Sequence, residues 1–303
     1  MRILTAGVNP LDNMIIKGEV KMIVPYKMPL VMGNEFVGII EKVGADVKDF
    51  RVGDRVYGRM PLAKPGAFAE YAAINADAVA VCPDYLTDIE AACIPLTALT
   101  ALRAFELIRP TAGDTVFISG GTGSFGAMAI PIAKSYGLNI ITNGSASGAD
   151  RVMSLGADRF IDYKKEDYSQ VLSGIDCVID TLGDREPAKE FAVLKDGGKL
   201  VSLRAMPNGE FAARFGMSAV KRLLFSLVGK KIDKAATARN QKYYFIFVHE
   251  DGAGLRRISE IFDRQRIKAS VDGIFELSDV NKALKKIASG GSSGKTVLHI
   301  SDR

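Results

Sequence analysis

The sequence predicts an α/β protein that combines a β-rich domain with a doubly wound parallel sheet. Three observations lead to this fold class. The chain has 303 residues and is 48% hydrophobic, which is enough for two domains with cores of ordinary size. Short β-branched runs separated by glycines and prolines fill residues 1–95. Candidate strands alternate with helices over residues 96–250, and residues 251–303 return to a mixed pattern.

Residues 1–95 are expected to form a small barrel or sandwich. The candidate strands are Phe36–Ile40, Asp54–Gly58 and Ala67–Tyr71. The tetrad Thr87–Glu90 reads as a capping box at the start of a helix. Pro95 is expected to interrupt the helical pattern, which resumes over residues 97–107.

The alternating region contains six candidate strands. They are expected at Thr115–Ser119, Asn139–Asn143, Arg159–Ile161, Asp176–Asp180, Lys199–Leu203 and Tyr243–Val248. Alternation of strands and helices favours a parallel sheet covered on both faces. In the tail, Ser278 is expected to cap a helix through Ile287, Gly290 and Gly291 to end it, and residues 296–300 to form a last strand.

The most informative stretch is Thr115–Gly126, which reads TVFISGGTGSFG. A buried strand runs directly into Gly121-x-Gly123-x-x-Gly126, and small and apolar residues at helical spacing follow. In a dinucleotide fingerprint the first glycine permits a tight turn, the second admits a pyrophosphate, and the third lets helix and strand pack closely. The N-terminus of the helix then offers N–H groups to the phosphates. A plain structural turn is the alternative, but the flanking strand and helix favour cofactor binding.

Composition argues against several classes of protein. The longest apolar run, Ala91–Leu102, is shorter than the roughly 20 residues of a membrane span, and no signal-peptide pattern opens the chain. Cys82, Cys93 and Cys177 are odd in number and far apart, so they form neither a disulfide framework nor a CxxC metal site. This cysteine usage is typical of a reducing cytoplasm.

The formal net charge of +5 is concentrated in one segment. Seven basic residues and one acidic residue lie between positions 218 and 242, so we do not expect general nucleic-acid binding. Within this segment Val220, Leu223, Leu224 and Leu227 form an apolar stripe at helical spacing. Two interpretations remain open, a lid over a substrate cleft and a weak contact with an anionic membrane surface.

Nine stretches match one family in the family's own order. They are AGVNPLD (6–12), GNEFVGIIEKVG (33–44), FRVGDRVYG (50–58), AACIPLTALTA (91–101), SGGTGSFG (119–126), SLGADRFIDY (154–163), DCVIDTLG (176–183), GGKLVSL (197–203) and SGKTVLHI (293–300). On these residues the chain resembles the medium-chain dehydrogenase/reductase superfamily, in its zinc-independent quinone oxidoreductase branch. The resemblance implies a GroES-like catalytic domain (1–95 and 251–303), a Rossmann domain (96–250) and a homodimer. Relatives begin earlier, so either the start lies too late or the catalytic domain lacks its first strands and exposes unpaired edges.

The resemblance also bears on metals. Zinc-dependent members place a Cys, a His and a Cys around a catalytic metal, and the matching positions here are Asn9 or its neighbours, Asn34 and Leu96. None of these is a usable zinc ligand. His249 and His299, the only histidines, have no ligand partner at useful spacing and are expected to be ordinary surface or strand residues. No metal is therefore expected.

For the cofactor, the resemblance favours NADPH over NADH. Readers of NAD keep an acidic residue at the end of the second strand, where this chain has Asn143-Gly144-Ser145. Ser145 and Tyr163 match residues that hold the 2′-phosphate in NADPH-using relatives. The usual lysine is Gly148 here, and Arg151 is the expected substitute, with a solvated helix residue as the alternative. The remaining expected cofactor contacts are Gly121, Thr122, Gly123, Ser124, Phe125, Gly126, Leu182 and Phe247.

Chemistry without a metal must come from the cofactor's hydride. Asn9 matches an Asn that relatives present near the nicotinamide, and its amide can donate to a carbonyl oxygen; a plain turn before Pro10 is the alternative. The expected function is reduction of a quinone or an α,β-unsaturated carbonyl. Two alternatives stay open, an enoyl-thioester or alkenal double-bond reductase and a non-catalytic NADPH-binding protein.

Overall fold

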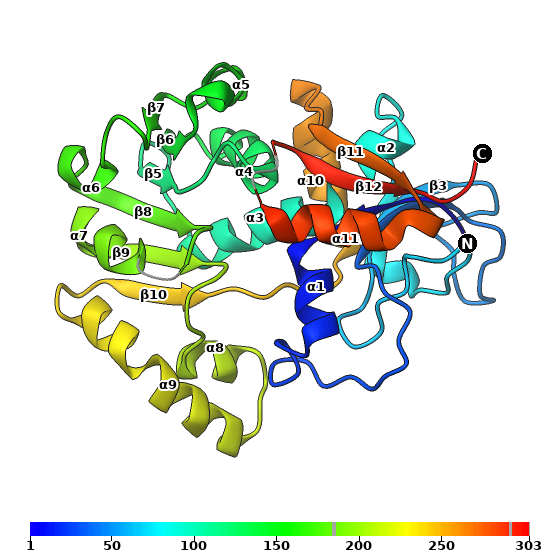
Figure 1. Ribbon diagram of the computed structural model, residues 1–303, viewed down its shortest axis with the longest axis horizontal. Coiled ribbons are helices and arrows are strands. Elements are labelled where there is room, and N and C mark those ends of the chain that lie inside the picture. Colours follow the sequence, from blue (N-terminus) through cyan, green and yellow to red (C-terminus); the bar gives the residue numbers. More distant parts are fainter. Residues whose placement is uncertain (184–185, 291–292, 303) are drawn as a thin grey trace. The chain divides into compact units, whose positions relative to one another are not determined.

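The computed structural model describes residues 1–183, 186–290 and 293–302 (Figure 1). The chain divides into two compact units. Unit 1 comprises residues 1–99 and 248–303, and unit 2 comprises residues 100–247. The first boundary therefore falls inside a helix, four residues beyond the expected position, because the apolar helix over residues 95–108 continues from one unit into the other.

Unit 1 contains a six-stranded sheet with the order β11-β12-β1-β2-β3-β4. Its strands are β1 (Arg2–Val8), β2 (Glu35–Ile39), β3 (Arg55–Arg59), β4 (Val79–Val81), β11 (Val271–Glu276) and β12 (Lys295–His299). All neighbours are antiparallel except β11 and β12. The first residues of the chain thus form a strand that is paired on both sides, by β12 and by β2.

The helices of unit 1 follow the capping rules of their sequence. They are α1 (Pro10–Lys17), α2 (Asp88–Ala91), α10 (Gly252–Gln265) and α11 (Val280–Ser289), with short 3-10 turns at Ala76–Ala78 and Leu277–Asp279. The predicted capping box is present, since Thr87 accepts from the Glu90 amide and Glu90 accepts from the Thr87 amide. Ser278 lies in a 3-10 turn and Asp279 stands at the N-cap of α11, so the predicted cap was one residue early.

The predicted interruption at Pro95 is confirmed, because α2 ends at Ala91 and a new helix, α3 (Pro95–Ile108), begins at the proline. Proline is favoured at the first helical position, which needs no intrahelical N–H bond. The strand predicted at residues 67–71 was wrong. Residues 67–71 form no strand beyond one bridge between Tyr71 and Arg2. The amides of Ala67 and Phe68 donate instead to carbonyls of residues 33 and 32, which turns this segment away from a ladder. Gly291, predicted to help end α11, lies outside the described residues.

Unit 2 contains a six-stranded parallel sheet with the order β10-β9-β8-β5-β6-β7. Its strands are β5 (Thr115–Ile118), β6 (Asn139–Gly144), β7 (Arg159–Asp162), β8 (Ile175–Asp180), β9 (Leu194–Ser202) and β10 (Lys242–Phe245), each near a predicted strand. The helices are α4 (Ser124–Ser135), α5 (Ala149–Ser154), α6 (Tyr168–Val171), α7 (Glu186–Val193), α8 (Gly209–Arg214) and α9 (Ala219–Thr237), with a 3-10 turn at Ala146–Gly148. The predicted Rossmann-type sheet is confirmed, and the strand order changes direction between β5 and β8, where such sheets bind ligands.

One helical stretch among the described residues, Asp88–Ile108, is long and apolar enough to cross a membrane. An 18-residue window of this stretch has a mean hydropathy of 1.5, but 72% of that window is buried inside the protein. A mostly buried stretch of this kind is what the core helix of a globular protein shows.

Candidate cofactor site and a buried polar network

The glycine-rich turn between β5 and α4 lies at the carboxyl end of the unit 2 sheet. Gly120 carries the left-handed backbone, with φ of 69°, so the tight bend falls one residue before Gly121. A Cβ atom added at Gly121 would lie 1.8 Å from Thr142 Oγ1 on β6. A Cβ atom added at Gly126 would lie 2.0 Å from the Gly121 carbonyl oxygen, which is a backbone atom that cannot move aside. These two glycines therefore permit close packing of turn, strand and helix.

Gly123 differs because the space beside it is open. Its φ is −82°, and an added Cβ atom would meet only the Gly120 carbonyl oxygen, at 3.4 Å. Gly123 is the N-cap residue of α4 and makes no side-chain cap. The first N–H groups of a helix have no intrahelical partners. An open cradle at the positive end of a 12-residue helix suits a diphosphate, so the described residues fit a dinucleotide here.

The end of β6 supports this turn and carries no carboxylate. Asn143 is buried, its Oδ1 accepts a hydrogen bond from the Gly120 amide at 2.8 Å, and its carbonyl oxygen accepts one from the Gly121 amide at 3.0 Å. The side chain at this position is therefore occupied in shaping the turn. Gly144 and Ser145 follow Asn143. The position where an Asp or Glu would bind the ribose 2′-hydroxyl of NAD therefore carries no negative charge.

Three of the predicted cofactor residues gather around this strand end. Ser145 follows β6 directly and is half-buried. The Tyr163 amide donates to the Gly144 carbonyl oxygen at 3.2 Å, while its side chain is 57% exposed. Arg151 Nη2 donates to the Thr122 carbonyl oxygen, which brings a guanidinium to the edge of the glycine turn. A purely solvated Arg151 is thus not what the structure shows.

Gly148 is explained by the same packing. An added Cβ atom at Gly148 would lie 2.6 Å from Thr122 Cγ2, so a longer side chain there requires Thr122 to move. In this chain the positive charge beside the end of β6 comes from Arg151, three residues after Gly148 in α5.

The end of β8 forms the other side of the glycine turn. Asp180 Oδ1 accepts hydrogen bonds from the Leu182 and Gly183 amides, both at 2.8 Å. This arrangement turns the chain so that Leu182 Cδ2 would lie 3.3 Å from a Cβ added at Gly120. Leu182, which is 42% exposed, therefore borders the turn, and its contact with a cofactor stays a prediction.

The other predicted contacts are less accessible or more remote. Thr122 and Ser124 belong to the turn and the first position of α4. Phe125 is buried in the first turn of α4. Phe247, the last residue of unit 2, packs edge-on against Phe215, with ring centroids 6.3 Å apart.

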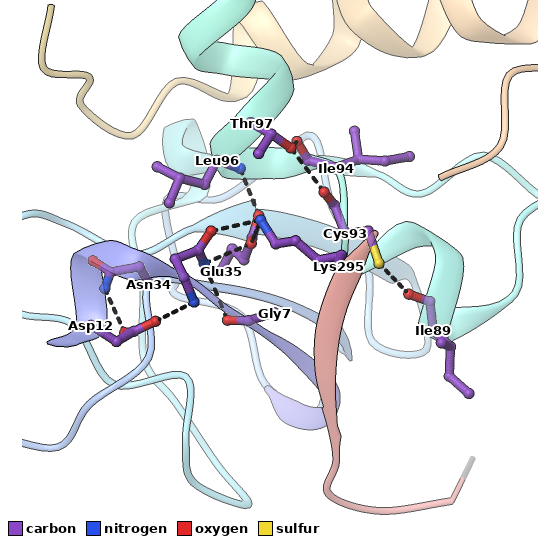
Figure 2. A network of polar contacts seen from close by, with 11 residues as sticks. Gly7, Asp12, Asn34, Glu35, Ile89, Cys93, Ile94, Leu96, Thr97 and Lys295 are labelled. Atoms are coloured by element: carbon purple, nitrogen blue, oxygen red, sulfur yellow. Dashed lines mark hydrogen bonds and ion pairs between the residues drawn. The ribbon is translucent and has the colours of Figure 1, made fainter. Parts of the chain in front are cut away.

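A second candidate site is a buried polar network in unit 1, part of which Figure 2 shows. Gly7, Glu35 and Arg59 stand directly opposite one another on β1, β2 and β3. Directly opposite residues share one face of a sheet. Glu35 uses the room above Gly7, since a Cβ added there would lie 2.4 Å from Glu35 Oε1. Lys295, at the start of β12, lies with its Nζ 2.6 Å from both Glu35 Oε1 and Asn9 Oδ1.

Asn9, the predicted catalytic residue, is held within this network and is only 3% exposed. Its Nδ2 donates to Glu35 Oε1 at 2.8 Å and to the Gly7 carbonyl oxygen at 3.3 Å, while its Oδ1 accepts from Lys295. Its backbone N–H donates to Asp12 Oδ2 at 2.8 Å. Both amide hydrogens are therefore engaged inside the protein, and the contact with Gly7 is the longer and weaker of the two.

The network extends to α3 through the second oxygen of Glu35. The Leu96 amide donates to Glu35 Oε2 at 2.7 Å, which supplies a partner for an N–H group in the first turn of the helix. The Thr97 hydroxyl donates to the Cys93 and Ile94 carbonyl oxygens, at 2.9 and 3.2 Å. Its hydroxyl is thereby part of the helix start.

Asp12, Glu35 and Arg59 of unit 1 are fully buried, and burial shifts the pKa of two of them. Burial raises the pKa of Asp12 to about 7, although hydrogen bonds from Asn9 and Asn34 oppose that rise. Burial likewise lowers the pKa of Arg59 to about 10, against the influence of nearby carboxylates. Arg59 donates through Nη1 to the Met60 carbonyl oxygen at 2.7 Å. Its other two nitrogens, Nε and Nη2, have no hydrogen-bond partner among the described residues, and neither has Asn34 Oδ1. Such atoms mark a place that an ordered water or a ligand atom completes.

Comparison with known proteins identifies the families that this chain resembles. The family model "Alcohol dehydrogenase GroES-like domain" matches residues 1–84, and "Zinc-binding dehydrogenase" matches residues 155–298. The chain is 28% identical to the NAD(P)H oxidoreductase RTN4IP1, mitochondrial, of Danio rerio, covering 99% of this chain and 83% of the relative. It is 29% identical to the 2-methylene-furan-3-one reductase of Solanum lycopersicum, covering 99% and 71%.

Solved structures agree on the fold. The quinone oxidoreductase from Coxiella burnetii superposes with a TM-score of 0.82 at 24% identity, covering 99% of this chain and 89% of that one. This chain belongs to the medium-chain dehydrogenase/reductase superfamily. The predicted fold class, a GroES-like domain with a Rossmann domain, is thereby confirmed, as is the predicted resemblance to the quinone oxidoreductase branch.

The positions that carry zinc ligands in other medium-chain dehydrogenases have different tasks here. Asn9 and Asn34 belong to the buried network, where Asn34 Nδ2 donates to Asp12 Oδ1 at 2.7 Å, and Leu96 offers an apolar side chain. His299 lies 3.2 Å from Glu276 and 3.3 Å from Asp302, and these contacts raise its pKa. Within residues 1–183, 186–290 and 293–302, no three His, Cys, Asp or Glu side chains gather closely enough to hold a metal ion.

Lys295 was not singled out from the sequence of this medium-chain reductase, and Glu35 and Asp12 were expected to be structural carboxylates with no chemical role. Local pattern offered little signal, because a lysine at the start of a C-terminal strand usually reads as a solvated residue. Pairing of β12 with β1 is what carries Lys295 to Glu35 and Asn9, which lie far away in the sequence.

Proposed function

We propose that this protein is a zinc-independent, NADPH-dependent oxidoreductase that transfers hydride to a quinone or another α,β-unsaturated carbonyl. The observation that carries the proposal is the open glycine cradle at Gly123, set between two glycines that cannot be replaced without a clash. Membership of the superfamily supports a nicotinamide cofactor. The Solanum relative is named for an exocyclic enone, and a quinone is chemically a cyclic enone, so the two acceptor types share one reaction.

The residues that would hold the cofactor lie along the carboxyl edge of the unit 2 sheet. Backbone N–H groups of the turn and of the first turn of α4 would bind the diphosphate, with Leu182 against it. Ser145, Tyr163 and Arg151 would hold a 2′-phosphate, and Arg151 would supply the charge. When bound, the reduced nicotinamide supplies the hydride.

The protein's own contribution to the reaction is to stabilise the charge that develops on the acceptor oxygen. We assign this role to the Asn9 amide. The Asn9 amide hydrogen that now points at the Gly7 carbonyl oxygen would turn toward the acceptor oxygen. Its present hydrogen bond is 3.3 Å long and is therefore the weaker of the two that the amide donates. The cation of Lys295 on Asn9 Oδ1 polarises the amide and makes its N–H groups better donors, and Glu35 keeps Lys295 in place.

The first test compares NADPH with NADH consumption over 9,10-phenanthrenequinone and a small panel of enones. Turnover of a quinone or an enone with NADPH preferred is the expected result. Turnover confined to enoyl thioesters or alkenals would indicate the double-bond reductase. Binding of NADPH without any turnover would indicate a non-catalytic binding protein, and stoichiometric zinc in the purified protein would contradict the metal-free chemistry.

Asn9→Ala and Asn9→Asp test the assigned role. Removing one donor to a developing oxyanion lowers kcat by about 10²–10³-fold. A loss of stability with kcat retained in the folded fraction would instead assign Asn9 to structure alone. We also expect a cytoplasmic homodimer, and light scattering of the purified protein checks the oligomeric state.

A further inference from the structure

Helix α9 carries an unusual surface for a helix packed against a globular domain. Its 19 residues bury one face through Phe225, Gly229 and Ala236. Phe225 packs edge-on against Phe211 of α8, with ring centroids 6.2 Å apart, and Gly229 lies against Asn208. These contacts fix which side of α9 faces the rest of unit 2, and Figure 1 shows α9 lying beside α8.

The opposite face of α9 is apolar in its first half. Val220 is 78% exposed, and Leu223 and Leu227 are each 63% exposed. Leu224 and Val228 lie beside them and are also exposed. Spacings of three and four residues place all five side chains on one face of the helix. Isolated exposed leucines need no explanation, but a contiguous stripe of five aliphatic side chains marks an interaction surface.

The same face is basic in its second half. Lys231 and Lys234 stand four and seven residues after Leu227 and so continue the stripe, with Lys230 next to them. Lys221 flanks the apolar half and is half-buried, whereas Lys230, Lys231 and Lys234 are exposed. Arg222 lies on the other side of the helix, where its Nε donates to the Met217 carbonyl oxygen at 2.8 Å. Asp233 is the one acidic residue of the helix, and the Asn208 amide donates to it at 2.6 Å from α8.

We propose that this face of α9, the apolar stripe with its lysines, docks on the surface of an anionic lipid membrane. A helix of this kind lies in the interface, with its aliphatic side chains among the acyl chains and its lysines at the anionic headgroups. Charge complementarity selects this partner over a second copy of the chain, because a second α9 would bring an equal set of basic residues against the first. Val and Leu without Trp, Tyr or Phe also differ from the side chains that dominate protein–protein interfaces.

Vesicle co-sedimentation tests the proposal independently of enzymatic activity. The full-length protein should bind phosphatidylcholine vesicles that contain phosphatidylserine, and it should not bind vesicles of phosphatidylcholine alone. Raising the salt to about 1 M should release it, because the screening length falls to about 3 Å. The double variant Lys230→Gln/Lys231→Gln should bind at least about thirtyfold more weakly.

The apolar half is tested by Leu223→Gln/Leu227→Gln, which should weaken binding about a hundredfold because two side chains no longer enter the acyl region. Matched controls are Lys164→Gln/Lys165→Gln, an adjacent exposed lysine pair of unit 2, and Val43→Gln/Val52→Gln, exposed valines of unit 1. The controls should bind as the wild type does. Unchanged unfolding transitions show that the variants remain folded.

Three outcomes would overturn the proposal. One is the absence of binding to anionic vesicles at low salt. Another is equal loss of binding in the α9 variants and in the controls. The third is a concentration-dependent dimer that Leu223→Gln/Leu227→Gln abolishes, which would assign the face to a second copy of the chain.

Discussion

Alanine substitutions at two glycines of the same turn should have opposite consequences. At Gly123 the added methyl group has room within the protein, since its nearest neighbour is one carbonyl oxygen at 3.4 Å and the φ of −82° suits any residue. The main folding penalty is the poorer N-cap, about 0.5–1 kcal/mol. At Gly126 the methyl group would lie 2.0 Å from a backbone oxygen and 2.4 Å from the Gly121 Cα atom, so the turn must shift. We expect Gly126→Ala to lose about 3 kcal/mol of stability.

Cofactor binding should be lost in the variant that keeps its stability, Gly123→Ala. The Gly123 methyl group occupies the space that the diphosphate would use, and it separates the phosphate from about two backbone donors. A hydrogen bond to a charged group contributes about 1.5–3 kcal/mol, so the loss is about 3–6 kcal/mol, or two to four orders of magnitude in Kd. Gly123→Ala should therefore be a folded protein that no longer binds NADPH at micromolar concentration.

Urea unfolding and isothermal titration calorimetry with NADPH separate the two effects. Gly44→Ala is the matched control, because a Cβ there meets only Val47 Cγ2 at an ordinary 3.7 Å. It should change neither stability nor binding by a measurable amount. Wild-type affinity in Gly123→Ala would refute the assignment of this turn to the diphosphate, whatever the fold of the domain.

The remaining predictions concern single side chains of the two sites. Arg151→Ala should raise KM for NADPH about tenfold or more while leaving KM for NADH unchanged, because only the 2′-phosphate needs the guanidinium; equal effects on both cofactors in steady-state kinetics would contradict this. Lys295→Met should cost about 3–5 kcal/mol in denaturant unfolding, since it strands a fully buried Glu35, and Glu35→Gln in the same chain should recover part of that loss. Asp12 has a folded pKa of about 7 against an ordinary 3.8, so its contribution to stability is fully present below about pH 4 and is lost as the pH rises through 7. A difference of about three pKa units corresponds to about 4 kcal/mol. The difference in free energy of unfolding between wild type and Asp12→Asn should therefore shrink by about that amount from pH 4 to pH 8. If urea unfolding gives the same difference at every pH, Asp12 does not have this role.

Much of unit 2 could be read from the sequence because its information is local. The strand Thr115–Ile118 is short and apolar, a glycine turn follows it closely, and it is buried in the middle of a parallel sheet. The glycine spacing needs only a strand before it and a helix after it, and both are adjacent in the chain. Even here the backbone decided a detail, since the left-handed residue is Gly120 and the residue with open space is Gly123.

The family and the absence of a carboxylate after β6 were also determined by sequence alone, because each depends on residue identity at fixed spacing. The structure of irregular segments could not be predicted from the sequence. Residues 67–71 have the composition of a strand, yet their amides bond to residues 32 and 33, which no local pattern specifies.

Only the tertiary structure decided the polar network of unit 1. Asn9, Glu35 and Lys295 are separated by up to 286 positions, and two strand pairings bring them within 2.8 Å of one another. The sequence by itself singled out Asn9 as a donor, but both of its amide hydrogens are bonded inside the protein. The physical reason is that a buried charge must find an opposite charge wherever the fold places one, and sheet register, not sequence spacing, sets that distance.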